Sequence, residues 1–586
     1  MLEKAPDTQV SAMANDDTGA TPTPSQESAS AVAAGVAKIQ GITRAWNKGR
    51  YIFFWACMML IAICVSLDYQ TVSAYQPYAL SEFKSHSLLS AVSTLQIILS
   101  ASSQPIMSKV ADAQGRTEAF GACLALMVLG FVINATSQSV EQMSAGQILY
   151  GFGLTGLQFI QQILSADTTS LEDRSIYSSA LYSPGIFTSW FGAPLVNTLV
   201  PNHWRWGYGM WAITFPAVAS PLIGLLVWSQ VQTNSVKRNT TKKTLATMAS
   251  EADIFGLFLF LVGLIFLLFP LTINARFKGE WSSPQTIAMM IIGGVSFIGF
   301  IAYELRVATY PILSLHLAKS RTVAAGCLAE ALFFCSGTCW SVYFYSFLIV
   351  ANNLSPAAAT NIVISGSVST AVCGMAVAFL LKKTGRPKWI VIAGTSIKLI
   401  GGGLIMRYAN SDATVAQILI AQIVQGGSSG LISVIVQTTV QAVGKHQDVA
   451  NVTTLYETLR VIGSATGSAI SGAIWTHMLL SRLQTHLPAA AQGRATAIQN
   501  SFVMASSFPV GSPERDAINQ SYTDVMRVLL TITLGFMAAS FLASLFIEDI
   551  DLKAVDRERN ETIRATSEMS PREDISHTGD IPDAAK

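Results

Sequence analysis

Long apolar runs recur along almost the whole chain, and they constrain its fold more than any other feature. About fourteen of these runs approach the roughly 20 residues that an α-helix needs to cross a bilayer. The chain has 586 residues, of which only 12% are charged, about half the share that is usual in soluble domains. So few charges cannot cover a soluble core of this length, and the sequence therefore predicts a polytopic membrane protein.

Two of the apolar runs look like an insertion between two groups of six. Without the seventh and eighth runs, the chain has six runs on either side of a basic connection. Two six-helix bundles with a substrate near the membrane midplane are a common architecture of transporters. We expect an all-α membrane protein with spans at residues 50–68, 88–107, 118–136, 143–166, 177–199, 207–231, 253–273, 285–303, 322–350, 356–381, 389–408, 415–443, 453–480 and 524–546.

Basic residues gather in alternate connections between the expected spans, which predicts their orientation. Lys109 and Arg116 lie in one such connection, and Lys382, Lys383 and Arg386 lie in another. Because cytosolic loops are rich in lysine and arginine, we expect these connections and both termini in the cytosol. The expected segments are a disordered tail at 1–49, a six-helix bundle at 50–231, a basic linker at 232–252, two inserted helices at 253–303, a second six-helix bundle at 304–547 with a long external loop at 481–523, and a disordered tail at 548–586.

The most informative polar stretch begins at the end of the first expected span. Asp68 follows an apolar run there. A carboxylate at membrane depth is costly unless it is paired or hydrated, so we expect it to face a partner or a water-filled path. Tyr69 and Tyr75 offer aromatic faces with hydroxyl tips to an amphipathic ligand. An alternative is that Tyr75 belongs to an aromatic belt at the membrane interface.

Further charges lie within expected spans of the second half. Glu330 has no basic residue nearby in the sequence, which makes it a candidate proton site alongside Asp68. Glu457 and Arg460 are three residues apart and can pair on one helix face. That pair is either structural or part of a proton relay. Downstream, Gly463 and Gly467 predict a small-residue face for helix packing.

The connection after the second span contains Asp112-Ala113-Gln114-Gly115-Arg116. Gly115 permits a tight turn, Asp112 can accept hydrogen bonds from a helix N-terminus, and Arg116 can pair with a carboxylate across the two halves. This pattern resembles the signature loop of major facilitator transporters, with Ser108 in place of the usual first glycine. The alternative is an ordinary polar turn. With Asp167, these residues are the candidate conformational gate.

Several stretches resemble the fungal siderophore–iron transporters of the major facilitator superfamily. The most specific are residues 67–79, which read Leu-Asp-Tyr-Gln-Thr-Val-Ser-Ala-Tyr-Gln-Pro-Tyr-Ala, and residues 467–476. The stretches at 87–89 and 166–171 also resemble this family. The resemblance covers roughly the whole region that contains the expected spans.

This resemblance implies the major facilitator fold and proton-driven import of ferric siderophores of the hydroxamate type. In alternating access, Asp68 or Glu330 would take a proton in the outward-open state and release it inside with the intact chelate. It implies a multi-pass protein of the plasma membrane, with a vacuolar or endosomal membrane as the alternative. The partners are then the ferric siderophore, protons and the lipid bilayer. We expect a monomer that needs no cofactor.

Aromatic and amide side chains in other spans are candidates for contact with this substrate. Gln158 and Gln161 lie on roughly one helix face, and they either line the cavity or hydrogen-bond a neighbouring helix. Tyr522 lies where the long external loop returns to the membrane, and we expect that loop to act as a lid or first contact. The further candidates are Trp190, Trp340, Tyr343 and Tyr345.

Other functions are less favoured by the sequence. A proton antiporter that exports drugs or glutathione shares the fold, but many such exporters have an arginine where Gln147 stands. A nutrient sensor is disfavoured because neither tail reads as a folded signalling domain. The net charge of +2 does not indicate a nucleic-acid partner, and the sequence contains no nucleophile–base pair or metal cluster that predicts an enzyme. Free iron needs oxygen-rich ligands, and the spans contain few carboxylates, so we expect the chelate to be the cargo.

Overall fold

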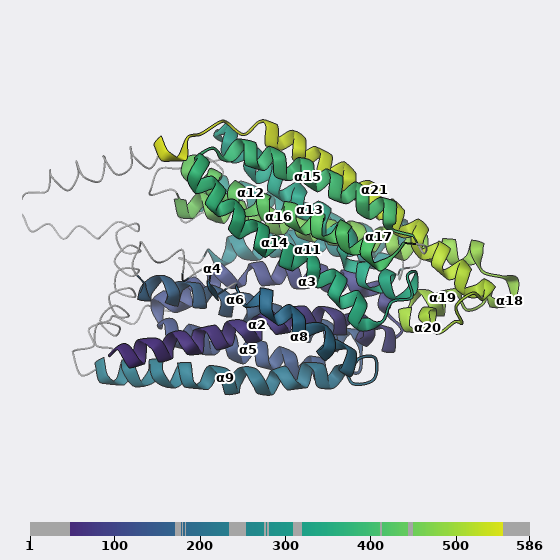
Figure 1. Ribbon diagram of the computed structural model, residues 1–586, viewed down its shortest axis with the longest axis horizontal. Coiled ribbons are helices and arrows are strands. Elements are labelled where there is room, and N and C mark those ends of the chain that lie inside the picture. The colour runs from purple at the N-terminus through teal and green to yellow at the C-terminus, as the bar shows by residue number, and fades with distance from the viewer. Residues whose placement is uncertain are drawn as a thin grey trace, which may run out of the picture.

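The computed structural model consists of long helices that run roughly side by side (Figure 1). The structure describes residues 47–169, 183–233, 253–274, 280–308, 319–410, 413–443 and 449–554, together with residues 177, 180, 181 and 277. Most of the two expected tails and of the expected basic linker lies outside the described residues.

The N-terminal half contains the expected runs, with two differences. The first expected span ends at residue 68, whereas α2 continues as one helix to Glu82. The second expected span is divided into α3 (Leu89–Ala101) and α4 (Ser103–Ala113). Pro105 has no N–H to donate to the Ala101 carbonyl, so the helical ladder is interrupted there. The other described helices of this half are α2 (Lys48–Glu82), α5 (Arg116–Thr136), α6 (Val140–Thr168), α8 (Pro184–Leu199) and α9 (Trp204–Thr233).

Serine–proline pairs mark the start of three later helices. Ser283, Ser355 and Ser512 each accept a hydrogen bond from the backbone N–H three residues further on. The proline that follows suits the first helical position, where an N–H would have no intrahelical partner. The later helices are α11 (Ile254–Ile273), α12 (Pro284–Arg306), α13 (Arg321–Val350), α14 (Pro356–Thr384), α15 (Pro387–Tyr408), α16 (Val415–Val443), α17 (Val449–His486) and α21 (Pro513–Leu545).

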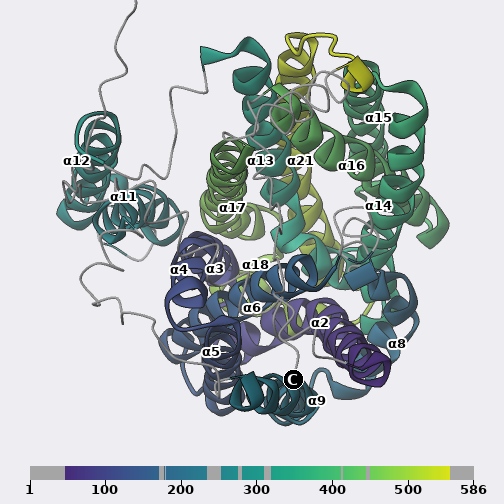
Figure 2. The same ribbon diagram turned by 90° about the vertical axis from the view of Figure 1, so that its left-hand side faces the viewer.

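The helices form two groups, and the α11–α12 pair lies to one side of them (Figure 2). Helix α3 of the N-terminal half packs against α17 of the C-terminal half, and α8 packs against α14. Helix α11 contacts both α3 and α17, so it touches both halves. Ten of the described helices are long and apolar enough to cross a membrane. The total of fourteen spans remains a prediction.

Close helix contacts in the C-terminal half depend on glycine. Gly463 and Gly467 of α17 pack against the α13 backbone at Ala331 and Cys335, where an added Cβ would overlap the carbonyl groups. Small residues of this kind let membrane helices approach closely. The predicted packing face at these two glycines is therefore confirmed.

The connection before the last helix is more helical than expected. Helix α17 continues to His486 and α21 already begins at Pro513. The connection between these helices is therefore shorter at both ends than the expected external loop at 481–523. The Ser512 cap accounts for the early start of α21. Between the two helices lie α18 (Ala489–Gln492), α19 (Ala495–Gln499) and α20 (Phe502–Ser506). We call residues 487–512 the lid after the role expected for them, which stays a prediction.

A buried arginine ties the lid to the helices beneath it. Arg515, near the start of α21, is 1% exposed. Its Nη1 atom donates to the Ala505 carbonyl of the lid at 3.1 Å, and its Nη2 atom donates to the Val350 carbonyl of α13 at 2.8 Å. Because these bonds are charge-assisted, they hold the lid firmly against the end of α13.

Candidate functional site

Asp68 lies within α2 and is completely buried. The Tyr150 hydroxyl of α6 donates a hydrogen bond to its Oδ2 atom at 2.8 Å. Among the described residues, its Oδ1 atom has no hydrogen-bond partner. The expectation that Asp68 faces a partner rather than lipid is therefore confirmed. One carboxylate oxygen remains available to accept a proton.

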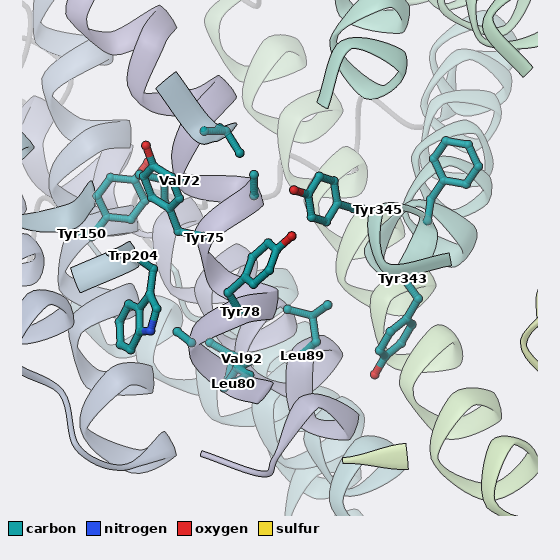
Figure 3. Packing of buried hydrophobic residues seen from close by; sticks show 14 of the residues in the cluster. Val72, Tyr75, Tyr78, Leu80, Leu89, Val92, Tyr150, Trp204, Tyr343 and Tyr345 are labelled. Carbon is teal, nitrogen blue, oxygen red and sulfur yellow. The ribbon is translucent and has the colours of Figure 1, made fainter. Parts of the chain in front are cut away.

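Neutral polar and aromatic groups surround this acid. The Gln147 amide donates to the Tyr208 hydroxyl at 3.0 Å, and the Tyr75 ring lies 5.8 Å from the Tyr208 ring. Figure 3 shows Tyr75 next to Tyr150. Tyr75 is completely buried, which disfavours the interpretation that it belongs to a lipid-facing aromatic belt. Its contact with substrate stays a prediction.

Three other candidates of the N-terminal half differ in their exposure and contacts. Tyr69 directly follows Asp68 in α2 and is 66% exposed. Gln161 is buried, and its amide donates to the Met58 carbonyl of α2 at 3.5 Å. This contact favours the interpretation in which Gln161 bridges two helices. Gln158 is half-buried, and its role stays a prediction.

Trp190 lies on a different surface from the other aromatic candidates. Its side chain is 70% exposed, and the side chains of Phe187 and Phe191 on the same helix are also exposed. An apolar face of this kind is what a helix presents to lipid. The structure therefore does not bring Trp190 together with the other candidates, and its contact with substrate stays a prediction without support from its position.

Glu330 of α13 is also completely buried, but it is surrounded differently from Asp68. Tyr456 and Ser433 lie beside it, yet the Tyr456 hydroxyl donates to the Ser433 carbonyl at 3.0 Å. Neither Glu330 oxygen has a hydrogen bond of normal geometry to a described residue. The Lys398 ammonium of α15 donates to the Ser429 hydroxyl at 2.7 Å and acts on Glu330 electrostatically. The fold thus supplies a basic neighbour that is distant in the sequence.

Glu457 and Arg460 form the predicted pair on one face of α17. The Arg460 Nε atom donates to Glu457 Oε2 at 2.7 Å, and both side chains are half-buried. The Arg460 guanidinium also lies 5.0 Å from the centre of the Phe334 ring. These contacts anchor the pair locally. A role in proton relay stays a prediction.

The corner between α4 and α5 turns at Gly115, whose φ of 130° is disfavoured for any residue with a Cβ. The next residue, Arg116, pairs with Asp167 at 3.3 Å, and both side chains are largely buried. Asp167 belongs to α6, so this pair lies within the N-terminal half, and pairing of Arg116 across the two halves stays a prediction. Helix α6 returns to the end of the bundle where this corner lies, and its carboxylate is therefore the nearer partner. The side chain of Asp112 lies outside the described parts of the chain.

Aromatic residues from both halves meet at the end of the molecule that the lid covers. The Tyr78 ring of α2 lies 6.3 Å from the Tyr345 ring of α13 and 4.8 Å from the Phe502 ring of the lid. Figure 3 shows the hydroxyl ends of Tyr78 and Tyr345 pointing toward one another. Two tyrosines and a phenylalanine thus join both halves and the lid at this end.

A second group of aromatic residues lies next to this contact. The Tyr343 and Trp475 rings stack in parallel with centres 4.1 Å apart, and Tyr522 meets Trp475 edge-on at 5.3 Å. Trp340 packs edge-on against Phe344 at 4.6 Å. Tyr343 and Tyr522 are completely buried, and Trp340 and Tyr345 nearly so. The structure therefore brings four of the predicted contact residues to the C-terminal side of this region.

Sequence reasoning missed several residues that the fold places at these sites. Tyr150 lies 82 positions from Asp68, and nothing in its sequence neighbourhood indicates the contact. His86, Asn500 and Phe502 meet where the α2–α3 connection touches the lid. Only the long connection before α21 gave a signal that this end of the protein is functional.

The chain is similar along most of its length to curated fungal proteins. Residues 58–327 match the sequence profile of the Major Facilitator Superfamily. The chain is 36% identical over 537 residues to MFS siderochrome iron transporter C of Aspergillus fumigatus, covering 89% of this chain and 88% of the relative. It is 36% identical over 533 residues to siderophore iron transporter mirC of Emericella nidulans, covering 89% and 87%. It is 31% identical over 526 residues to siderophore iron transporter 1 of Schizosaccharomyces pombe, covering 89% and 86%.

Solved structures with a similar fold are also transporters. A crystal structure of the peptide transporter POT has a TM-score of 0.55 at 14% identity, covering 84% of this chain and 95% of that chain. The nucleoside transporter NupG has a TM-score of 0.51 at 11% identity, covering 84% and 99%. Together with the sequence profile, these likenesses confirm the major facilitator fold. Since several relatives exceed 30% identity along nearly the whole chain, this protein belongs to the fungal siderophore iron transporters of the major facilitator superfamily and is not an enzyme.

Proposed function

We propose that this protein imports ferric siderophores of the hydroxamate type together with protons, by alternating access. Its relatives are named siderophore iron transporters, which supports the cargo. The observation that carries the coupling is Asp68, a fully buried carboxylate with one hydrogen-bonded oxygen and one oxygen that has no partner among the described residues. Protonation removes a charge that is costly at membrane depth, so it lowers the cost of moving the loaded carrier.

We infer that the lid faces the outside of the plasma membrane and that both termini lie in the cytosol. The Leu552 N–H, which follows α21, donates to the Gly385 carbonyl at 3.0 Å, so the end of α21 lies beside the basic corner between α14 and α15. The lid precedes α21 and lies at the opposite end of the molecule (Figure 1). Because basic connections stay in the cytosol, the lid is external.

The contacts at the lid correspond to a state that is closed toward the outside. Tyr78 and the connection after α2 belong to the N-terminal half, whereas Tyr345, Tyr343 and the lid belong to the C-terminal half. A substrate that arrives from outside can enter only after these contacts separate. Outward opening therefore includes a movement of the lid away from the α2–α3 connection.

Uptake into a yeast strain that lacks its own carriers tests the proposal. Cells that express the chain are supplied with several radiolabelled ferric siderophores, with and without an uncoupler. Accumulation of at least one ferric hydroxamate that the uncoupler abolishes is the expected result. If no chelate accumulates while glutathione or a drug is pumped out, import is overturned in favour of export.

A further inference from the structure

His86 begins the short helix η1 (His86–Leu88), which connects α2 to α3. Its side chain is completely buried. The imidazole lies 5.1 Å from the Phe502 ring of the lid and 5.8 Å from the Tyr343 ring of α13. Within the described part of the chain, neither ring nitrogen has a hydrogen-bond partner. A buried titratable group between two aromatic rings is unusual, because buried polar groups normally find a partner.

Hydrogen bonds join His86 and Ser87 to the lid and to α13. The His86 N–H donates to the Asn500 carbonyl at 3.0 Å, and the Ser87 hydroxyl donates to Asn500 Oδ1 at 2.8 Å. The Tyr343 hydroxyl donates to the Ser87 carbonyl at 2.9 Å. Residues 86 and 87 belong to the N-terminal half, whereas Asn500 and Tyr343 belong to the C-terminal half. These bonds must therefore break when the two halves separate at this end.

The elements next to His86 on the side of α2 and the lid offer no partner for a charged imidazole. Helices α3, α19 and α20 contain no acidic or basic residue. Glu82, near the end of α2, accepts hydrogen bonds from Trp204 Nε1 at 2.6 Å and from Arg205 Nη1 at 2.7 Å. Lys84 is exposed and has the same charge as a protonated histidine. No charged group on this side would therefore stabilise a protonated His86.

The elements on the other side are equally unsuited to a charged imidazole. Arg482 and His486 of α17 each have a nitrogen 3.8 Å from a carboxylate oxygen of Asp524 of α21. This carboxylate therefore already has two basic neighbours. His477 of α17 is hydrogen-bonded to Asn274. The Tyr343 hydroxyl donates to the Ser87 carbonyl, and because it is neutral it supplies no negative charge to a protonated imidazole. In this closed arrangement, a positive charge on His86 would be buried without compensation.

We propose that His86 is a proton-binding latch of the external gate, which closes under the lid when it is neutral and stays open when it is protonated. The inference rests on the proposed function only for the side of the membrane that the lid faces. It adds a proton site that is separate from Asp68 and that lies where the acidic side of the gradient can reach it. Protons would then favour the state that accepts substrate before any proton reaches the membrane interior.

The sign of the effect follows from burial. Burial lowers the pKa of His86 to about 3 in the closed state, whereas a hydrated imidazole has a pKa of about 6.5. The closed state therefore binds fewer protons than the open state between these two pH values. It is fully favoured above about pH 6.5 and loses stability as the external pH falls below that value. The ratio of open to closed protein should rise about tenfold between about pH 7.5 and about pH 5.5.

Alkylation of a cysteine under the lid measures this opening without any siderophore. Ser87→Cys places a thiol of nearly the same size as the native hydroxyl beneath Asn500, and Val510→Cys places one on the exposed surface of the lid, where the native side chain is 68% exposed. A membrane-impermeant maleimide is applied to intact cells, and labelling of the unmodified chain is subtracted. The rate at Ser87→Cys divided by the rate at Val510→Cys cancels the intrinsic pH dependence of thiol alkylation.

We expect this ratio to rise about tenfold from about pH 7.5 to about pH 5.5, and to become independent of pH when His86→Gln or His86→Phe is added. Two substitutions guard against the failure of one variant to fold. A ratio that does not change with pH, or that rises equally in both variants, overturns the latch. If the latch operates but no ferric siderophore accumulates, the proposed function fails instead. If the external reagent labels neither cysteine, the proposed orientation fails and the latch on the acidic side fails with it.

Discussion

The two halves of this transporter each bury a carboxylate, but the groups that surround the two carboxylates differ. In the N-terminal half, Asp68 accepts a hydrogen bond from the neutral Tyr150, and no ion pair is found for it within the described residues. In the C-terminal half, Glu330 lacks a hydrogen bond of normal geometry but has two cations, Arg460 and the buried Lys398, in its electrostatic neighbourhood. Asp68 is therefore stabilised by the dipole of a neutral hydroxyl, whereas the charge of Glu330 is offset by nearby positive charge.

Under the proposed proton coupling, this difference favours one of the two acids as the proton carrier. An acid that faces a cation gains from staying ionised, whereas an acid that faces only a neutral donor pays the full cost of its charge at membrane depth. Asp68 therefore has more to gain from a proton than Glu330. We infer that Asp68 is the coupling site and that Glu330 and Lys398 balance one another within the C-terminal half.

The largest expected effect comes from removing the Asp68 carboxylate. Asp68→Asn should abolish accumulation against a gradient, while binding of the ferric siderophore stays largely intact. The expected loss is roughly tenfold or more, because each pH unit of gradient can support about a tenfold accumulation. Uptake of radiolabelled chelate measures it, with Glu82→Gln as a matched acid-to-amide control on the same helix. Full accumulation by Asp68→Asn would remove this residue from the mechanism.

The second effect concerns stability and tests the charge balance around Glu330. Glu330→Gln and Lys398→Met should each destabilise the protein by about 3 kcal/mol, since each removes a buried charge that offsets the other. The double variant should be more stable than the sum of the two losses predicts, by about 1–3 kcal/mol. Thermal unfolding of the four purified proteins in detergent gives this coupling. Strictly additive losses would show that the two groups do not balance one another.

The halves also differ at two similar corners on the side away from the lid. Gly115 and Gly385 both have positive φ values, of 130° and 71°, and each is followed by an arginine that pairs with an aspartate. The Arg116–Asp167 pair is largely buried at 3.3 Å. In the other pair, Arg386 is 63% exposed and lies 3.8 Å from Asp549. Burial, not the local sequence, separates a strong pair from a weak one.

Substitution of the two arginines should therefore give unequal results. Arg116→Gln should destabilise the protein by about 3 kcal/mol, because it removes the charged partner of a largely buried carboxylate. Arg386→Gln should cost about 1 kcal/mol or less, since water screens the exposed pair. Thermal unfolding at low and high salt measures both losses. Equal losses, or a strong effect of salt on the Arg116 pair, would contradict the contrast.

The smallest effect comes from the donor to Asp68. Tyr150→Phe removes the hydroxyl but keeps the ring, and it should slow uptake by about threefold to tenfold, because one hydrogen bond contributes about 1 kcal/mol. Tyr303→Phe is the matched control, since Tyr303 donates to Asp253 at 2.9 Å outside the two halves. Initial uptake rates distinguish the two variants. Equal rates would show that the Tyr150 bond has no part in transport.

The regular parts of the fold were predictable, whereas several details were not. Apolar runs located the helices well because lipid requires every spanning segment to be apolar and internally hydrogen-bonded. The break before Pro105 and the early start of α21 at Ser512–Pro513 were missed, although both follow from local chemistry. At the site, the buried Asp68 and the Glu457–Arg460 pair were predicted. Tyr150 and His86 were not, because their contacts join segments that are distant in the sequence.

The sequence by itself determined that this chain is a helical membrane transporter, which acids lie in its helices and to which family it belongs. Only the tertiary structure decided which groups meet those acids. It paired Asp68 with a neutral tyrosine, brought Lys398 near Glu330 and enclosed His86 beneath the lid. The physical reason is that apolar length is a local property, which lipid selects residue by residue. The cost of a buried charge depends instead on a few atoms that only folding brings within reach.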